Sequence, residues 1–213
     1  MQLEAAVSVR SGILAMVAQG PTYGYLLRAE FDRRTGTAWP LNVGQVYKAL
    51  ETLERDGLVS KSDQTDAAGH VFYEITAAGQ AAVADWLGNA ESSAQPSRND
   101  VAIKIAIAAT LPGVDVSGVI RTQRQAAIRH LQQLTRASSA AVPTTGDELG
   151  RQLVTDAILF DAETEVRWLD HVAARIAAAT RAGLTLDVPL DSTPPRRGRP
   201  AGSGRTTKDD AND

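Results

Sequence analysis

Two polar side chains, Gln45 and Lys48, stand three residues apart in a segment whose apolar residues recur at helical spacing. Both can bind base edges in the major groove of DNA, because glutamine pairs with adenine and lysine reaches guanine or a phosphate. Together with Gly44 and Thr52 they lie on the side of the helix opposite its apolar face. Gly44 also allows the start of this helix to approach a backbone closely. The pattern is typical of a helix that contacts a nucleic acid.

The other chemically active residues form no recognised catalytic or metal-binding pattern. His70, His130 and His171 are scattered, and the sequence has no His-Glu-x-x-His, no Gly-x-Ser-x-Gly and no phosphate-binding loop. Asp161 and Glu165 lie four residues apart on an amphipathic helix, where a solvated edge is more common than a catalytic pair. The absence of cysteine excludes thiolate metal sites, disulfides and Cys nucleophiles. We therefore predict no enzyme, no cofactor and no metal site.

Residues 1–88 contain the elements that would position Gln45 and Lys48. Helical periodicity covers residues 4–18, then 22–34 with Thr22 as the predicted N-cap, then a third helix that Asn42 begins. Short strands are predicted at 58–61 and 70–75, and a fourth helix runs from Thr76 to residue 87. Three helices, a hairpin and a helix form a winged helix-turn-helix pattern, in which the hairpin is the wing. The third helix buries Val46, Leu50 and Leu53.

The net charge of -3, from 22 Lys+Arg and 25 Asp+Glu, seems to argue against nucleic-acid binding. Its distribution along the 213 residues is uneven. Residues 1–88 are acidic, whereas residues 194–205 contain four arginines and no acid. The total therefore conceals a local basic element.

Residues 100–188 follow a small, polar linker at 89–99 and are predicted to be helical. Residues 116–136 and 149–181 both show an amphipathic helical pattern. A helix over 149–181 would span about 50 Å, which is too long for an 88-residue neighbour to cover. Pairing with a second copy of the chain is the natural solution, so we predict a homodimer.

Residues 1–88 contain several short motifs in a fixed order: Gly20-Pro21, Gly24-Tyr25, Tyr47, the run 50–59 and the strand-to-helix join from Tyr73 to Gly79. Together these motifs resemble the PadR family of bacterial transcriptional regulators. Further along, Arg98-Asn99-Asp100 with Lys104 resembles the opening of the family's helical C-terminal half. The resemblance implies a DNA-binding regulator that dimerises through this half, with help from the N-terminal helix. It also implies that Tyr47 contacts a phosphate.

Two departures from the family pattern concern the DNA contacts. Lys48 stands where family members commonly have proline, and strand 70–74 lacks the usual Arg and Lys. The wing turn also has Asp63 and Asp66, and acid near phosphate lowers affinity. We therefore expect the wing to grip DNA weakly by charge, through Lys61. Thr22 and Tyr23, at the start of the second helix, are further candidates for phosphate contacts.

The C-terminal tail contains a segment at 195–200 that resembles an AT-hook. Gly198 would let an extended backbone sit deep in the minor groove of A·T-rich DNA, while Arg197 and Arg199 follow its floor. Pro200 would keep the segment extended. The alternative is a solvated basic tail with no groove preference.

Together these observations predict a mainly α chain with a small β-hairpin wing. The expected organisation is a winged helix-turn-helix domain at 1–88, a linker at 89–99, a helical dimerisation domain at 100–188 and a disordered tail at 189–213. The predicted function is sequence-specific binding of double-stranded DNA at an inverted repeat by a homodimer, most simply as a repressor, through Asn42, Gly44, Gln45 and Lys48. An adaptor that acts through protein contacts without reading DNA is the alternative.

Two further expectations concern ligands and location. Phe160 and Trp168 could line an aromatic pocket for a small-molecule effector, although such residues are more often plain core. No run of 18 to 20 uncharged apolar residues and no signal-peptide core is present, so we expect a soluble cytoplasmic protein without a membrane partner, associated with the nucleoid when bound to DNA.

Overall fold

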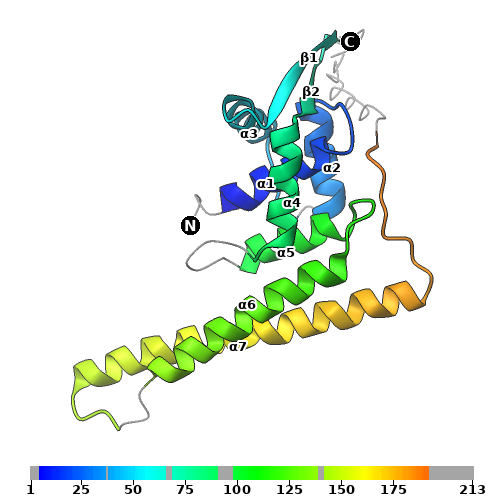
Figure 1. Cartoon of the computed structure of the whole chain (residues 1–213). Coiled ribbons are helices and arrows are strands. Elements are labelled where there is room, and N and C mark those ends of the chain that lie inside the picture. Colours follow the sequence, from blue (N-terminus) through cyan, green and yellow to red (C-terminus); the bar gives the residue numbers. More distant parts are fainter. Residues whose placement is uncertain (1–4, 37, 66–68, 91–97, 139–141, 192–213) are drawn as a thin grey trace, which may run out of the picture.

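The computed structural model describes residues 5–36, 38–65, 69–90, 98–138 and 142–191, and shows helices with one small hairpin (Figure 1). The first half contains α1 (Ala5–Val17), α2 (Gly24–Thr35), α3 (Val43–Arg55), β1 (Val59–Thr65), β2 (Val71–Ile75) and α4 (Ala77–Gly88). The second half contains α5 (Arg98–Ala108), α6 (Val116–Ala137) and α7 (Gly146–Arg181). This order confirms the predicted fold class. None of the described helices is both long and apolar enough to cross a membrane.

The wing is an antiparallel pair in which Val59 lies opposite Ile75 and Lys61 lies opposite Tyr73. Its base is joined to the start of α2 by a two-way backbone bridge. The Thr22 N–H donates to the Tyr73 carbonyl at 3.2 Å, and the Tyr73 N–H donates to the Thr22 carbonyl at 2.7 Å. The wing is therefore anchored to the helix-turn-helix rather than only to its own turn.

The join between β2 and α4 requires glycine at position 79. A Cβ atom there would lie 2.1 Å from the Leu58 carbonyl oxygen, far inside van der Waals contact. Thr76 forms the N-cap of α4, since its hydroxyl oxygen accepts from the Gly79 N–H at 3.0 Å. The Thr-x-x-Gly sequence thus both caps the helix and allows it to pack against the chain that enters the wing.

The core of the first half extends into α5. Val46, Leu50 and Leu53 of α3 are fully buried, as the sequence predicts, and Ile103 and Ile107 of α5 lie in the same cluster. The other side of α5, including Val101 and Ile105, packs in a second cluster with α6 and with Leu169 of α7. A single helix therefore contributes to both cores.

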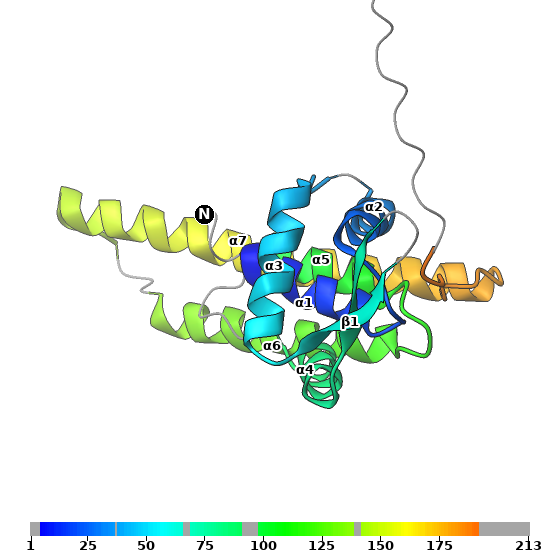
Figure 2. The same ribbon diagram turned by 90° about the horizontal axis from the view of Figure 1, so that it is seen from above.

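The helices α6 and α7 form an antiparallel hairpin below the winged domain (Figure 1), and seen from above the hairpin extends past that domain on both sides (Figure 2). A capping box begins α7: the Glu148 N–H donates to the Thr145 hydroxyl at 3.2 Å, and the Glu148 carboxylate accepts from the Thr145 N–H at 3.3 Å. The helix is therefore three residues longer at its start than the periodicity predicts.

After α7 the chain turns back and runs beside the winged domain (Figure 1). We call residues 184–191 the C-terminal strap. Leu186, Val188 and Leu190 alternate with exposed residues, as in an extended segment with one packed face. The predicted tail begins at 189, but Pro189 and Leu190 line a cavity together with residues of α1, α4 and the loop before α6. The sequence analysis overlooked the alternation of Leu186, Val188 and Leu190, which gives this segment one apolar face.

Candidate nucleic-acid interface

The solvent-facing side of α3 carries the residues predicted to contact DNA. Gly44, Gln45, Tyr47 and Lys48 are all exposed, while Val46 on the opposite side is completely buried. Asn42, the residue before the helix, is exposed as well. The structure thus places this predicted set together at the start of one helix, directed away from the core.

A capping box occupies part of the hydrogen-bonding capacity of Asn42 and Gln45. The Gln45 N–H donates to Asn42 Oδ1 at 2.8 Å, and the Asn42 N–H donates to Gln45 Oε1 at 2.9 Å. The predicted bidentate pairing of glutamine with adenine would use Oε1 and therefore would have to compete with the cap. Each side chain retains its amide NH2 group as a donor. This box places two donors at the tip of α3.

Tyr47 lies across the start of α2, and Gly24 makes this possible. A Cβ atom at position 24 would come within 2.8 Å of Tyr47 Cζ. The ring is 37% exposed, and it sits at the end of α2 where backbone N–H groups have no helical partner. Such a helix end attracts anions. A phosphate contact by Tyr47, which the family resemblance implies, is compatible with this position.

The expectation that Thr22 and Tyr23 contact phosphate is not supported, because their side chains are 0% and 3% exposed. Tyr23 rather than Thr22 is the N-cap residue of α2. The Tyr23 ring stacks on His70 with 4.3 Å between ring centroids and meets the edge of Phe72. The helix-start pattern suggested exposed residues, but the second strand of the wing folds back over them. Both residues brace the wing instead.

Lys61, the predicted basic contact of the wing, forms an ion pair with Glu54 of α3 at 2.8 Å. This hydrogen bond raises the pKa of Lys61, which keeps the ammonium charged while an adjacent carboxylate balances it. Glu51 is also exposed on α3. The surface beside the wing therefore has mixed charge. Asp66, expected to weaken phosphate contacts further, lies outside the described residues, as do the tail residues Arg197, Gly198, Arg199 and Pro200.

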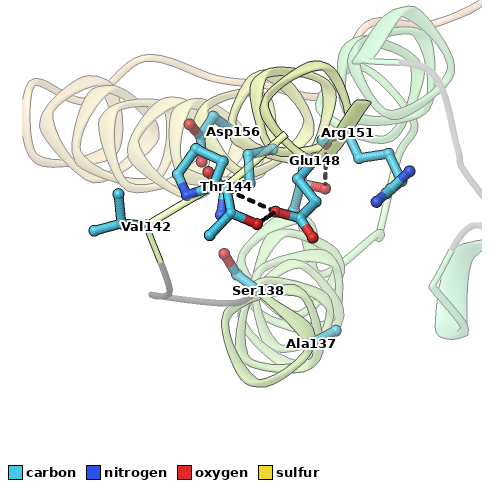
Figure 3. A pocket seen from close by; sticks show the side chains of 10 residues that line it. Ala137, Ser138, Val142, Thr144, Glu148, Arg151 and Asp156 are labelled. Atoms are coloured by element: carbon cyan, nitrogen blue, oxygen red, sulfur yellow. Dashed lines mark hydrogen bonds between the residues drawn. The ribbon is translucent and has the colours of Figure 1, made fainter. Parts of the chain in front are cut away.

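The predicted effector residues lie apart. Phe160 is 63% exposed on α7, whereas Trp168 is half-buried in the second cluster. Phe160 and Trp168 line neither of the two cavities described next. One cavity, of about 580 Å³, lies between the end of α6 and the start of α7 (Figure 3). The other, of about 420 Å³ and mainly apolar, lies between α1, α4 and the strap.

The first cavity is built around the cap of α7. Glu148 accepts from the Thr144 N–H at 2.7 Å and from the Thr144 hydroxyl at 2.8 Å (Figure 3). These hydrogen bonds lower the pKa of Glu148. Its carboxylate is thus committed to the helix start. In the described part of the chain, no group of three His, Cys, Asp or Glu residues could hold a metal ion.

Comparison with known proteins identifies both halves. Residues 13–85 match the model of the transcriptional regulator PadR-like family, and residues 97–177 match the family model described as virulence activator alpha C-term. Residues 13–85 form a domain of the PadR-like family. Because this family consists of transcriptional regulators, the prediction that the chain is a transcriptional regulator and not an enzyme is confirmed.

Two curated relatives of this PadR-like chain are also regulators. The probable transcriptional regulator Rv1176c of Mycobacterium tuberculosis is 26% identical over 76% of the chain and 93% of its own length. The negative transcriptional regulator PadR of Bacillus subtilis is 23% identical over 79% of the chain and 97% of its own length.

Solved structures with similarity include Bacillus subtilis PadR in complex with operator DNA, at 21% identity and a TM-score of 0.36, which covers 78% of this chain and 96% of that one. The same protein in complex with p-coumaric acid has 20% identity and a TM-score of 0.35, covering 81% of this chain and 97% of that one.

Proposed function

We propose that this PadR-like regulator binds an inverted-repeat operator as a homodimer and inserts α3 of each protomer into the major groove. The observation that carries the proposal is the exposed tip of α3, where Asn42, Gly44, Gln45 and Lys48 stand opposite a fully buried apolar face. A helix with this division has a diameter of about 10–12 Å, which fits a major groove about 12 Å wide. Two such helices related by a two-fold axis would contact half-sites one DNA turn apart.

The test must separate loss of base contacts from loss of the helix cap. Gln45→Glu keeps a side-chain acceptor for the Asn42 N–H, because glutamate serves at this position of a capping box as well as glutamine does. It removes the amide donor and adds a negative charge facing the DNA. We combine it with Lys48→Ala, which removes the one lysine on this face of α3.

The experiment first selects duplexes from a random-sequence pool with the full-length protein, and then measures their affinity by gel shift. We expect the double variant to lose at least a hundredfold in affinity while its unfolding midpoint stays within a few degrees of wild type, since each good base contact contributes about 1–3 kcal/mol. Unchanged affinity would refute the assignment to α3. Recovery of no preferred sequence from the pool would instead support the adaptor alternative.

The support for a homodimer comes from α7, which has two apolar faces. Ala162 and Leu169 are buried on one side, whereas Leu149, Leu153 and Phe160 are 47%, 60% and 63% exposed on the opposite side. At 100° per residue, these three exposed side chains fall within about 40° of one another. An uncovered apolar stripe over three turns of helix is the feature that a second copy would bury.

We further propose that the regulator is a repressor, by analogy with the relative named as a negative regulator, and that it acts in the bacterial cytoplasm, at the nucleoid when bound to DNA. A small-molecule effector would act by changing the spacing of the two α3 helices. The AT-hook-like segment at 195–200 would add contacts in flanking A·T-rich minor grooves.

A further inference from the structure

The C-terminal strap forms three hydrogen bonds in succession, one to Thr110 just after α5 and two to the end of α2 in the winged domain. The Val188 N–H donates to the Thr110 carbonyl at 3.0 Å. Arg34 donates to the Val188 carbonyl at 3.1 Å, and Arg33 donates to the Pro189 carbonyl at 2.9 Å. Both arginines belong to the last turn of α2, the first helix of the helix-turn-helix. The point where the strap ends is therefore set by the DNA-binding domain rather than by α7.

Glu30 holds both arginines in place. Its carboxylate is 1% exposed and pairs with Arg33 and Arg34 in the same turn of helix. The Arg34 guanidinium, whose side chain is also 1% exposed, donates in addition to the Thr110 hydroxyl at 3.1 Å and to Gln19 Oε1 at 3.3 Å. Arg33 is 41% exposed and makes the outermost bond. The inner arginine is thus part of the fold, and the outer one can be changed without leaving Glu30 unpaired.

Apolar contacts support the same placement. Pro189 and Leu190 line the cavity of about 420 Å³ together with Ala15, Leu111 and Val114. Leu186 packs against the second cluster at the start of the strap. The strap is therefore held by side-chain packing as well as by hydrogen bonds, and it ends next to α2.

We propose that Arg33 is a positioning residue that fixes where the basic segment 195–200 leaves the protein, so that this segment is delivered to DNA beside the half-site bound by the same protomer. The inference rests on the proposed function of that segment in the minor groove. From Pro189 to Arg197 the chain has eight residues, which span at most about 26 Å. The twelve residues of α2 span about 18 Å, which is less than this length of chain. Arg197 and Arg199 of the basic segment can therefore reach beyond the helix-turn-helix.

The strap shortens the length of chain between the last bonded residue and the basic segment. Without it, the free chain would begin after Arg181 and would contain about twice as many residues before Arg197. Effective concentration falls roughly as the −3/2 power of linker length, so releasing the strap should lower the contribution of the tail about threefold. The contribution would fall without any change in the segment that contacts DNA.

The experiment measures the affinity of the full-length protein for its pool-selected site, flanked either by A·T or by G·C base pairs. The variants are Arg33→Gln, Val188→Pro, which removes the donor to Thr110, and a chain that ends at Asp191. Each substitution is also made in the shortened chain. Arg136→Gln, at an exposed position near the end of α6, is the control for loss of one positive charge.

We expect Arg33→Gln and Val188→Pro each to lower affinity about threefold on A·T flanks, with little effect on G·C flanks, and to have no effect in the shortened chain. Equal losses in the full and shortened chains would show that Arg33 acts on the fold or on DNA directly, and would overturn the proposal. A full effect of tail removal together with no effect of either strap variant would also overturn it. Failure to select any site would instead reject the proposed function.

Discussion

At the scale of single residues, two features make the winged domain intolerant of change. Gly79 must be glycine because its Cα lies against the Leu58 carbonyl. Glu30 must be charged because two arginines depend on it. Neither residue faces the predicted DNA surface, so changes in them test the fold separately from binding.

Gly79→Ala should destabilise the protein by roughly 2–4 kcal/mol, because the new Cβ would overlap a backbone oxygen that cannot rotate away. Urea unfolding followed by circular dichroism measures this. The matched control is Gly150→Ala in α7, where a Cβ meets nothing within 4 Å. That change should be neutral or stabilise by up to about 1 kcal/mol. Similar effects of the two substitutions would contradict the assigned contact.

Glu30 gives the fold a defined dependence on pH. Burial raises the pKa of this carboxyl, but the hydrogen bonds from Arg33 and Arg34 outweigh burial, and its pKa lies below the ordinary value of 4.5. A group with a lowered pKa in the folded state stabilises the fold above its unfolded pKa, and this contribution is lost as the pH falls through the folded value. Acid should therefore weaken the ion pairs.

Glu30→Gln should lower the unfolding free energy at pH 7 by roughly 3 kcal/mol, because it leaves the buried Arg34 without its counter-charge. The difference between variant and wild type should shrink as the pH falls below about 4. Chemical denaturation at several pH values provides the measurement. A difference that stays constant down to pH 3 would argue against this role of the carboxylate.

At the scale of elements, α3 is defined by its cap as much as by its apolar face. The reciprocal hydrogen bonds between Asn42 and Gln45 satisfy two backbone donors at the tip that would enter the groove. The same two side chains therefore cap the helix and belong to the set that we propose contacts bases. A loss of binding after mutation of either residue has two possible causes.

Asn42→Ala should reduce stability by about 1 kcal/mol and also weaken DNA binding, because the first turn of α3 frays. Asn42→Asp keeps an acceptor for the Gln45 N–H, so its stability should remain near wild type while its affinity for DNA falls through added negative charge. Thermal unfolding and gel-shift titration separate the two effects. A stable Asn42→Ala variant would show that the cap is dispensable.

At the scale of the whole molecule, α7 carries the apolar surface that a single copy of the chain leaves exposed to solvent. Its exposed stripe of Leu149, Leu153 and Phe160 gives way to polar residues such as His171 further along the same side. This limits the proposed dimer contact to the first half of the helix, on the part of the hairpin that extends away from the winged domain (Figure 2).

Leu153→Glu together with Phe160→Glu should convert the proposed dimer into a monomer with an intact fold, because these substitutions would place carboxylates in an apolar interface. Light scattering after size-exclusion chromatography measures the mass. His171→Glu, on the same side but in the polar region, should remain dimeric. If the double variant keeps the mass of the wild-type protein, this stripe is not the dimer contact.

The sequence alone was sufficient for the local elements: the buried face of α3, its cap at Asn42, the hairpin and the amphipathic character of α6 and α7. These follow from periodicity and capping, which depend only on neighbouring residues. The tertiary structure decided contacts between distant segments. Burial of Thr22 and Tyr23 under the wing and attachment of the strap to Arg33 and Arg34 join residues far apart in the chain. Pairing of Lys61 with Glu54 depends on how the first wing strand folds back along α3. Local patterns do not specify such pairs, because which exposed-looking side chains become covered depends on how the elements pack.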